Sequence, residues 1–194
     1  MTYKFDKIKI LVIDGMTPMR DIVKSVLNVF GVKQILTSET AEQGFEILCR
    51  EDPDLIITDW MNGSLSGLDF IQKVRKDPNV PNPYVPILMM TGYSSRPRVE
   101  QARDIGVTEF LVKPFSAETL YTRIANIIEN PRQFVDTGEF FGPDRRRRVG
   151  EDYDGPRKRE EDENKFYVDL SPQDHDKANE LLKQLQKDAE NLQG

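Results

Sequence analysis

Five short hydrophobic runs alternate with amphipathic segments along the first two thirds of the chain. The runs cover residues 8–13, 34–36, 55–59, 85–90 and 108–112. Such runs are typical of strands buried on both faces, and their alternation with helices is typical of a parallel sheet. The pattern predicts an α/β fold in which a doubly wound, five-stranded parallel sheet carries helices on both faces.

The segments between these runs carry helix signals. In the first segment, Thr17 has the residue type of an N-cap and Pro18 suits the first helical position, while Gly31 marks the end. A capping-box spacing predicts that a second helix begins at Thr40. Three further helices are predicted over residues 67–75, between residues 95 and 106, and around residues 120–128.

The composition narrows the classes of function. No run approaches the roughly 20 apolar residues that span a bilayer, and the N-terminus lacks the apolar core of a signal peptide, so we expect a soluble, cytoplasmic protein with no membrane insertion. The net charge of −6 argues against general nucleic-acid binding. Cys49 and His175 are the only cysteine and histidine, which excludes a zinc site built from clusters of these residues.

Four polar residues stand at the C-terminal ends of predicted strands, namely Asp14, Asp59, Thr91 and Lys113. In an open parallel sheet, ligands bind beyond these strand ends. A carboxylate that accepts a phosphoryl group needs cationic groups to offset charge and a hydroxyl to sense the product. Asp59, Lys113 and Thr91 suit the nucleophile, cation and hydroxyl, so the sequence predicts an aspartyl-phosphate switch.

The motifs around these residues resemble the CheY-like receiver domains of bacterial response regulators, over about residues 7–130. They are Leu11-Val12-Ile13-Asp14 with Met19-Arg20, Ile57-Thr58-Asp59-Trp60 with Gly67-Leu68, Met90-Thr91 and Val112-Lys113-Pro114-Phe115. The resemblance implies the flavodoxin-like fold and Asp59 as phosphoacceptor, with Thr91 and Lys113 contacting the phosphate. It also implies a cis peptide bond between Lys113 and Pro114.

The resemblance further implies a magnesium ion bound by Asp14, Asp59 and the backbone carbonyl of Met61. Receivers usually carry two adjacent acidic residues after the first strand, but here Gly15 follows Asp14. Magnesium favours octahedral oxygen coordination, so the loss of one carboxylate should weaken the ion and, with it, phosphorylation.

Phe110 occupies the place of the aromatic residue whose rotation reports the state of the site in receivers. Phenylalanine lacks the hydroxyl that tyrosine offers to a partner. A switching role and an ordinary buried aromatic are both open for Phe110.

The composition changes after residue 130. Residues 136–169 are rich in Gly, Pro, Arg and acidic residues and poor in aliphatic ones, so we expect them to be mobile without a ligand. Leucine and alanine repeat at helical spacing after Pro172, which predicts a terminal amphipathic helix. The predicted domains are a receiver over residues 1–130, an arginine-rich flexible extension over 131–170 and the helix over 171–194.

The extension combines guanidinium groups, carboxylates and an aromatic ring. Arginine binds phosphate and the guanine edge bidentately, and carboxylates accept hydrogen bonds from guanine N1 and N2. This portion resembles the extension of CheY-like proteins of the Cle type, which implies binding of cyclic di-GMP. The candidate nucleotide-binding residues are Asp144, Arg145, Arg146, Arg147, Arg148, Asp152, Tyr153, Asp154, Arg157 and Arg159.

Other interpretations of the tail remain open. A charge-balanced, solvated linker and a site for anionic lipid or RNA are both compatible with its composition. The terminal helix would dock on the receiver, pack on a copy of itself or be presented to a partner.

The leading hypothesis is a non-enzymatic signalling adaptor that binds cyclic di-GMP and then a flagellar motor or chemotaxis protein. The alternative is a conventional response regulator whose Asp59 takes phosphate from a histidine kinase. An independent enzyme is disfavoured because the chain has no Gly-rich phosphate loop and its single histidine lies in the tail.

Overall fold

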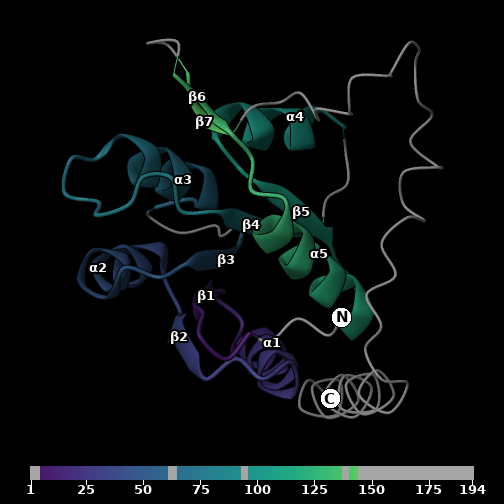
Figure 1. Ribbon diagram of the computed structural model, residues 1–194. Coiled ribbons are helices and arrows are strands. Elements are labelled where there is room, and N and C mark those ends of the chain that lie inside the picture. Colours follow the sequence, from purple (N-terminus) through teal and green to yellow (C-terminus); the bar gives the residue numbers. More distant parts are fainter. Residues whose placement is uncertain (1–4, 61–64, 93–95, 137–139, 144–194) are drawn as a thin grey trace.

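The five predicted strands form one parallel sheet. The computed structural model describes residues 5–60, 65–92, 96–136 and 140–143. The strands are β1 (Lys9–Ile13), β2 (Gln34–Ser38), β3 (Leu55–Asp59), β4 (Ile87–Thr91) and β5 (Glu109–Val112), in the order β2-β1-β3-β4-β5 (Figure 1). The predicted fold class is confirmed.

Five helices cover the two faces of this sheet. They are α1 (Thr17–Val29), α2 (Ala41–Glu51), α3 (Gly67–Lys76), α4 (Arg96–Ile105) and α5 (Ala117–Glu129). Along β1, Ile10 and Val12 join the core beneath α1 and α5, whereas Leu11 and Ile13 join the core beneath α2 and α3. This alternation follows from the two-residue period of a strand and explains why both faces need apolar residues. No helix among the described residues is long and apolar enough to cross a membrane.

Helix starts agree with the predictions except at α1. Thr40 caps α2 as predicted, and its hydroxyl accepts from the backbone of Gln43 at 3.3 Å. The N-cap of α1 is Met16, not Thr17, which is the first helical residue. The reason lies two residues before Met16. The Met16 N–H donates to the carboxylate of Asp14, and this bond fixes the backbone where it enters the helix.

Strand bounds differ from the predicted ones mainly at β2, which continues two residues further to Ser38, and at β4. The apolar run begins at Val85, but the strand begins at Ile87 and ends at Thr91. The carbonyl of Val85 accepts a hydrogen bond from the guanidinium of Arg75 at 2.8 Å. The carbonyl of Val85 therefore bonds to a side chain, and pairing of β4 with β3 begins two residues later, at Ile87.

The predicted division between receiver and extension at residue 130 stays a prediction, but two short strands lie within the part assigned to the extension. Strands β6 (Phe134–Asp136) and β7 (Phe141–Pro143) pair in antiparallel fashion, and β7 contacts α3 and α4. Two phenylalanines in a polar segment give this hairpin an apolar face, which Tyr84 covers. The predictions for residues 144–170 and 171–194 lie outside the described residues.

Arg75 is a buried cation at the base of the hairpin. Its side chain donates to the carbonyls of Pro83, Val85 and, twice, Gly106, at 2.6 to 3.2 Å. Burial lowers the pKa of Arg75 to about 9, so the guanidinium stays charged at neutral pH. The four hydrogen bonds offset the cost of desolvating this charge.

We expect Arg75→Met to destabilise the fold by about 2–4 kcal/mol, because it leaves three carbonyl groups without their donor. Urea unfolding followed by circular dichroism measures the change. Arg50→Met is the control, since the side chain of Arg50 is 70% exposed. A loss no larger than that of the control would show that water replaces these hydrogen bonds.

Candidate functional site

The predicted site residues meet at one edge of the sheet. Asp14 follows β1, Asp59 ends β3, Thr91 ends β4 and Lys113 follows β5. The strands are parallel and in register, so their carboxyl ends bring these residues together. Asp14 and Thr91 are buried, whereas the side chain of Asp59 is 25% exposed to solvent.

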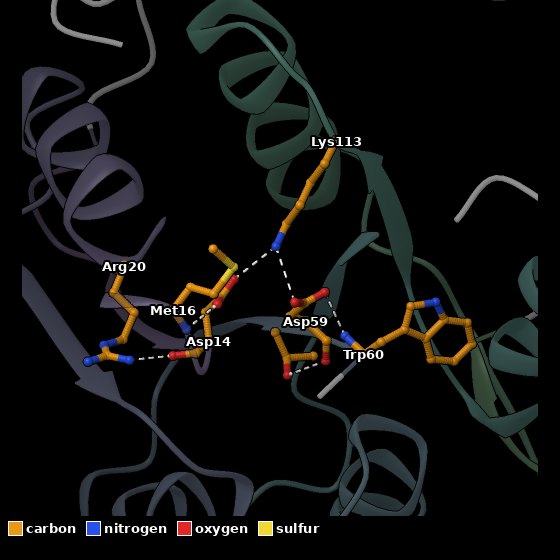
Figure 2. Close-up of polar contacts among 7 residues, drawn as sticks. Asp14, Met16, Arg20, Asp59, Trp60 and Lys113 are labelled. Carbon is orange, nitrogen blue, oxygen red and sulfur yellow. Dashed lines mark hydrogen bonds and ion pairs between the residues drawn. The ribbon is translucent and has the colours of Figure 1, made fainter. Parts of the chain in front are cut away.

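Lys113 bridges the two carboxylates. Its ammonium lies 2.9 Å from Asp14 Oδ2 and 3.2 Å from Asp59 Oδ2, and Figure 2 shows its side chain reaching between them. The backbone N–H of Lys113 donates to the carbonyl of Thr91 at 2.7 Å, which fixes where the lysine leaves the sheet. The peptide bond that follows, to Pro114, is cis as predicted.

The remaining carboxylate oxygens face backbone donors. Asp14 Oδ1 accepts from Met16 N–H at 2.8 Å, and Asp59 Oδ1 accepts from Trp60 N–H at 2.8 Å. Three of the four carboxylate oxygens therefore accept a hydrogen bond, and the fourth, Asp59 Oδ2, is ion-paired with Lys113. Both side chains are held in one orientation without another ligand (Figure 2).

Arg20 is a second cation that the sequence analysis did not assign to the site. Its Nη1 donates to the backbone carbonyl of Asp14 at 2.6 Å, and its Nη2 lies 3.7 Å from Glu39 Oε2. A helical side chain points toward the N-terminus of its helix, so an arginine in the first turn of α1 reaches back to the end of β1. That rule was the available signal.

Gly67 lets α3 begin directly against the end of β3, which carries Asp59. A Cβ at this position would lie 2.5 Å from the carbonyl oxygens of both Asp59 and Trp60. The Gly67 N–H also donates to the Trp60 carbonyl at 2.7 Å. No larger residue fits there without moving α3 or the end of β3.

The other predicted residues fall into two groups. Phe110 is half-buried and packs against the core beneath α2 and α3, so its role stays a prediction. Met61 and the ten candidate nucleotide-binding residues, from Asp144 to Arg159, lie outside the described residues.

The described donors at this site fit a divalent cation poorly. Magnesium requires six oxygen ligands in near-ideal geometry, and the acidic side chains here are Asp14 and Asp59, both paired with Lys113. Gly15 contributes no side-chain oxygen. Among the described residues, no group of three acidic, histidine or cysteine side chains is placed to hold a metal. Lys113 offsets one of the two negative charges.

We expect Gly15→Asp to raise the affinity for Mg²⁺ on the order of tenfold, because it restores a carboxylate to the pocket. A Cβ at Gly15 meets only the Glu39 carbonyl at 3.9 Å, so the side chain has room. Trp60 is the only tryptophan and adjoins Asp59, so its fluorescence reports the titration. Gly15→Asn is the control of equal size, and an equal affinity in the two variants would contradict the prediction.

Known proteins share this domain. The response regulator receiver domain model matches residues 10–125. The chain is 31% identical to chemotaxis protein CheY-3 of Vibrio cholerae serotype O1 and 32% identical to chemotaxis protein CheY1 of Helicobacter pylori, each over 121 residues. These matches cover 62% of the chain and 92% and 96% of the two relatives.

Solved structures agree with these matches. The structure of the chemotaxis response regulator CheY4 of Vibrio cholerae aligns with a TM-score of 0.57 and 27% identity, over 62% of this chain and 98% of that one. A response regulator receiver domain protein from Clostridium thermocellum aligns with a TM-score of 0.57 and 29% identity, over 63% of this chain and 94% of that one. On the receiver match and the Asp14, Asp59 and Lys113 geometry, the chain belongs to the response regulator receiver domain family.

Proposed function

We propose that this chain is a cytoplasmic, CheY-like signalling adaptor for chemotaxis or flagellar control. The observation that carries the proposal is the pair of carboxylates bridged by Lys113 at the end of the sheet. Several relatives are named as chemotaxis proteins, which supports this area of function. A chemotaxis or flagellar motor protein is the proposed partner.

Asp59 is the proposed phosphoacceptor, and a histidine kinase is the proposed donor. In the transfer, a carboxylate oxygen of Asp59 forms a bond to phosphorus while the bond between phosphorus and the donor breaks, and its electron pair leaves with the donor. Lys113, 3.2 Å from that carboxylate, offers a positive charge to the phosphate oxygens. Thr91 offers the hydroxyl at the adjacent strand end.

Cyclic di-GMP is the proposed second input and, in this chain, the principal one. The phosphoacceptor pocket lacks a carboxylate at Gly15, which disfavours rapid phosphorylation, whereas Arg145 to Arg148 supply four guanidinium groups within four residues. Such groups bind phosphates and guanine edges bidentately. The nucleotide would then control whether the receiver binds its partner.

We expect slow, Mg²⁺-dependent labelling of Asp59 by acetyl phosphate, at a rate on the order of tenfold below that of Gly15→Asp. Intact-protein mass spectrometry measures the labelled fraction over time. Asp59→Asn is the control and should remain unlabelled, because an amide is not a nucleophile of this kind. Rapid labelling of the wild type would make phosphate the principal input, and no labelling of either protein would exclude Asp59 as phosphoacceptor.

We expect cyclic di-GMP to bind the full chain with micromolar or tighter affinity in calorimetry, and cyclic di-AMP and GTP to bind at least tenfold more weakly. Replacement of Arg145 to Arg148 by alanine should weaken binding by about a hundredfold or more, because each guanidinium contributes charge-assisted hydrogen bonds. The receiver fold should be unchanged by circular dichroism.

A charge-matched control separates a specific site from a general effect of charge. Four exposed lysines of the receiver, Lys7, Lys24, Lys33 and Lys76, are replaced by alanine in one variant. This variant should bind cyclic di-GMP as the wild type does. Equal loss in both quadruple variants would reduce the arginines to a general electrostatic contribution, and absence of binding by the wild type would exclude the nucleotide input.

A further inference from the structure

The β6–β7 hairpin is built onto the receiver through an aromatic cluster. The ring of Tyr84 lies 5.2 Å from the rings of both Phe134 and Phe141, and the two phenylalanine rings lie 5.6 Å apart. Tyr84 comes from the loop before β4, at the end of the sheet opposite Asp59. In Figure 1 the hairpin runs beside α4. The two strands are three residues each, so these rings rather than the strand pairing hold the hairpin in place.

The buried guanidinium of Arg75 connects the hairpin with the end of α4. Its Cζ lies 5.1 Å from the centre of the Phe134 ring, a distance typical of a cation–π contact. The same guanidinium donates two hydrogen bonds to the carbonyl of Gly106, the residue that follows α4. Phe134 and Gly106 are therefore held on one rigid group.

The backbones of the hairpin and of the α4 terminus are in direct contact. A Cβ on Gly142 would lie 3.0 Å from Gly106 Cα, and a Cβ on Gly106 would lie 3.4 Å from the carbonyl oxygen of Phe141. Gly106 also has a φ of +112°, which a residue with a side chain rarely adopts. Glycine on both sides allows β7 to lie against the turn that ends α4.

The start of the hairpin is tied to the sheet by ion pairs. Glu109 of β5 is buried, and its two carboxylate oxygens lie 3.4 Å from Arg123 of α5 and from Arg132. Arg132 precedes β6 by two residues. The hairpin is thus fixed both where it leaves α5 and where it passes α4.

The described side chains of α4 bury little surface. Of residues 99–105, Ala102 is buried and Ile105 is partly buried against the core beneath α2 and α3. A stretch of equal length in α3, residues 70–76, buries four. An element with so little buried apolar surface opens more readily than its neighbours. One end of α4 follows Thr91 of the candidate site by five residues, and its other end rests on the hairpin.

We propose that the β6–β7 hairpin is a brace for α4, and that through α4 it links the arginine-rich segment after Pro143 to the phosphoacceptor site. Pro143 ends β7 immediately before Asp144, so the arginine-rich segment is covalently continuous with the brace, and a ligand bound to that segment would be linked to it by the chain itself. Linkage between two sites is reciprocal at equilibrium. Phosphorylation of Asp59 would therefore change the affinity for that ligand by the same factor by which the ligand changes the equilibrium constant of phosphorylation. The identity of the ligand rests on the proposed function, whereas the brace does not.

Hydrogen exchange measured by mass spectrometry on the full chain tests the brace. Phe134→Ala with Phe141→Ala removes the aromatic contacts, and Gly142→Val displaces β7 from Gly106 without removing a ring. In both variants the amides of residues 99–105 should exchange on the order of tenfold faster than in the wild type. The amides of α5 should exchange at the wild-type rate, which shows that the domain is still folded.

Phe45→Ala is the matched control. Phe45 is a half-buried aromatic that contacts Lys73 of α3 at 3.8 Å, so its removal also deletes a cation–π contact with α3, away from the hairpin. Exchange of residues 99–105 should be unchanged in this variant. Unchanged exchange in both hairpin variants, or an equal acceleration in Phe45→Ala, would overturn the brace.

Addition of saturating cyclic di-GMP tests the link. In the wild type, residues 99–105 should exchange more slowly with the nucleotide, whereas the hairpin variants should bind it in calorimetry without this change in α4. Binding to the wild type without any change in α4 would overturn the link. If the wild type does not bind the nucleotide, cyclic di-GMP is excluded as the ligand of the link. The hydrogen exchange of the hairpin variants without ligand still decides whether the hairpin braces α4.

Discussion

The ammonium of Lys113 between two carboxylates is the interaction on which the site depends. Asp14 is fully buried, and an unpaired carboxylate at that position would be costly, so the ammonium of Lys113 and the N–H of Met16, which both contact it, make the arrangement possible. The sheet supplies the positions, because three parallel strands end at one edge. The lysine supplies the charge that holds those ends together.

The same balance explains how a receiver can tolerate Gly15. Two carboxylates with one ammonium and the nearby guanidinium of Arg20 need less added positive charge than three carboxylates with one ammonium would. Without the third carboxylate, we expect a lower affinity for a divalent ion, while Lys113 and the Trp60 N–H still hold the carboxylate of Asp59. The proposed nucleotide input is consistent with such a pocket, because Arg145 to Arg148 carry guanidinium groups that can bind phosphate.

The opposite end of the sheet carries a second buried cation with a different task. Arg75 meets backbone carbonyls and an aromatic ring instead of carboxylates, and so it joins the loop before β4, the end of α4 and the hairpin into one unit. Lys113 holds the two carboxylates of the candidate site, and Arg75 holds the β6–β7 hairpin. Helix α4, with Ala102 as its one buried side chain among residues 99–105, lies between the two.

The sequence alone determined the sheet, the order of its helices and the meeting of Asp14, Asp59 and Lys113, because hydrophobic periodicity sets the elements and parallel strands bring their carboxyl ends together. The tertiary structure decided what depends on contacts between distant segments. Two features rest on such contacts: the Gly106 carbonyl that accepts from Arg75, 31 residues away, and the hairpin whose phenylalanines pack on Tyr84. Local composition predicted a flexible extension after residue 130. It does not show that Tyr84 and Arg75 pack against Phe134, or that Gly106 lies against Gly142.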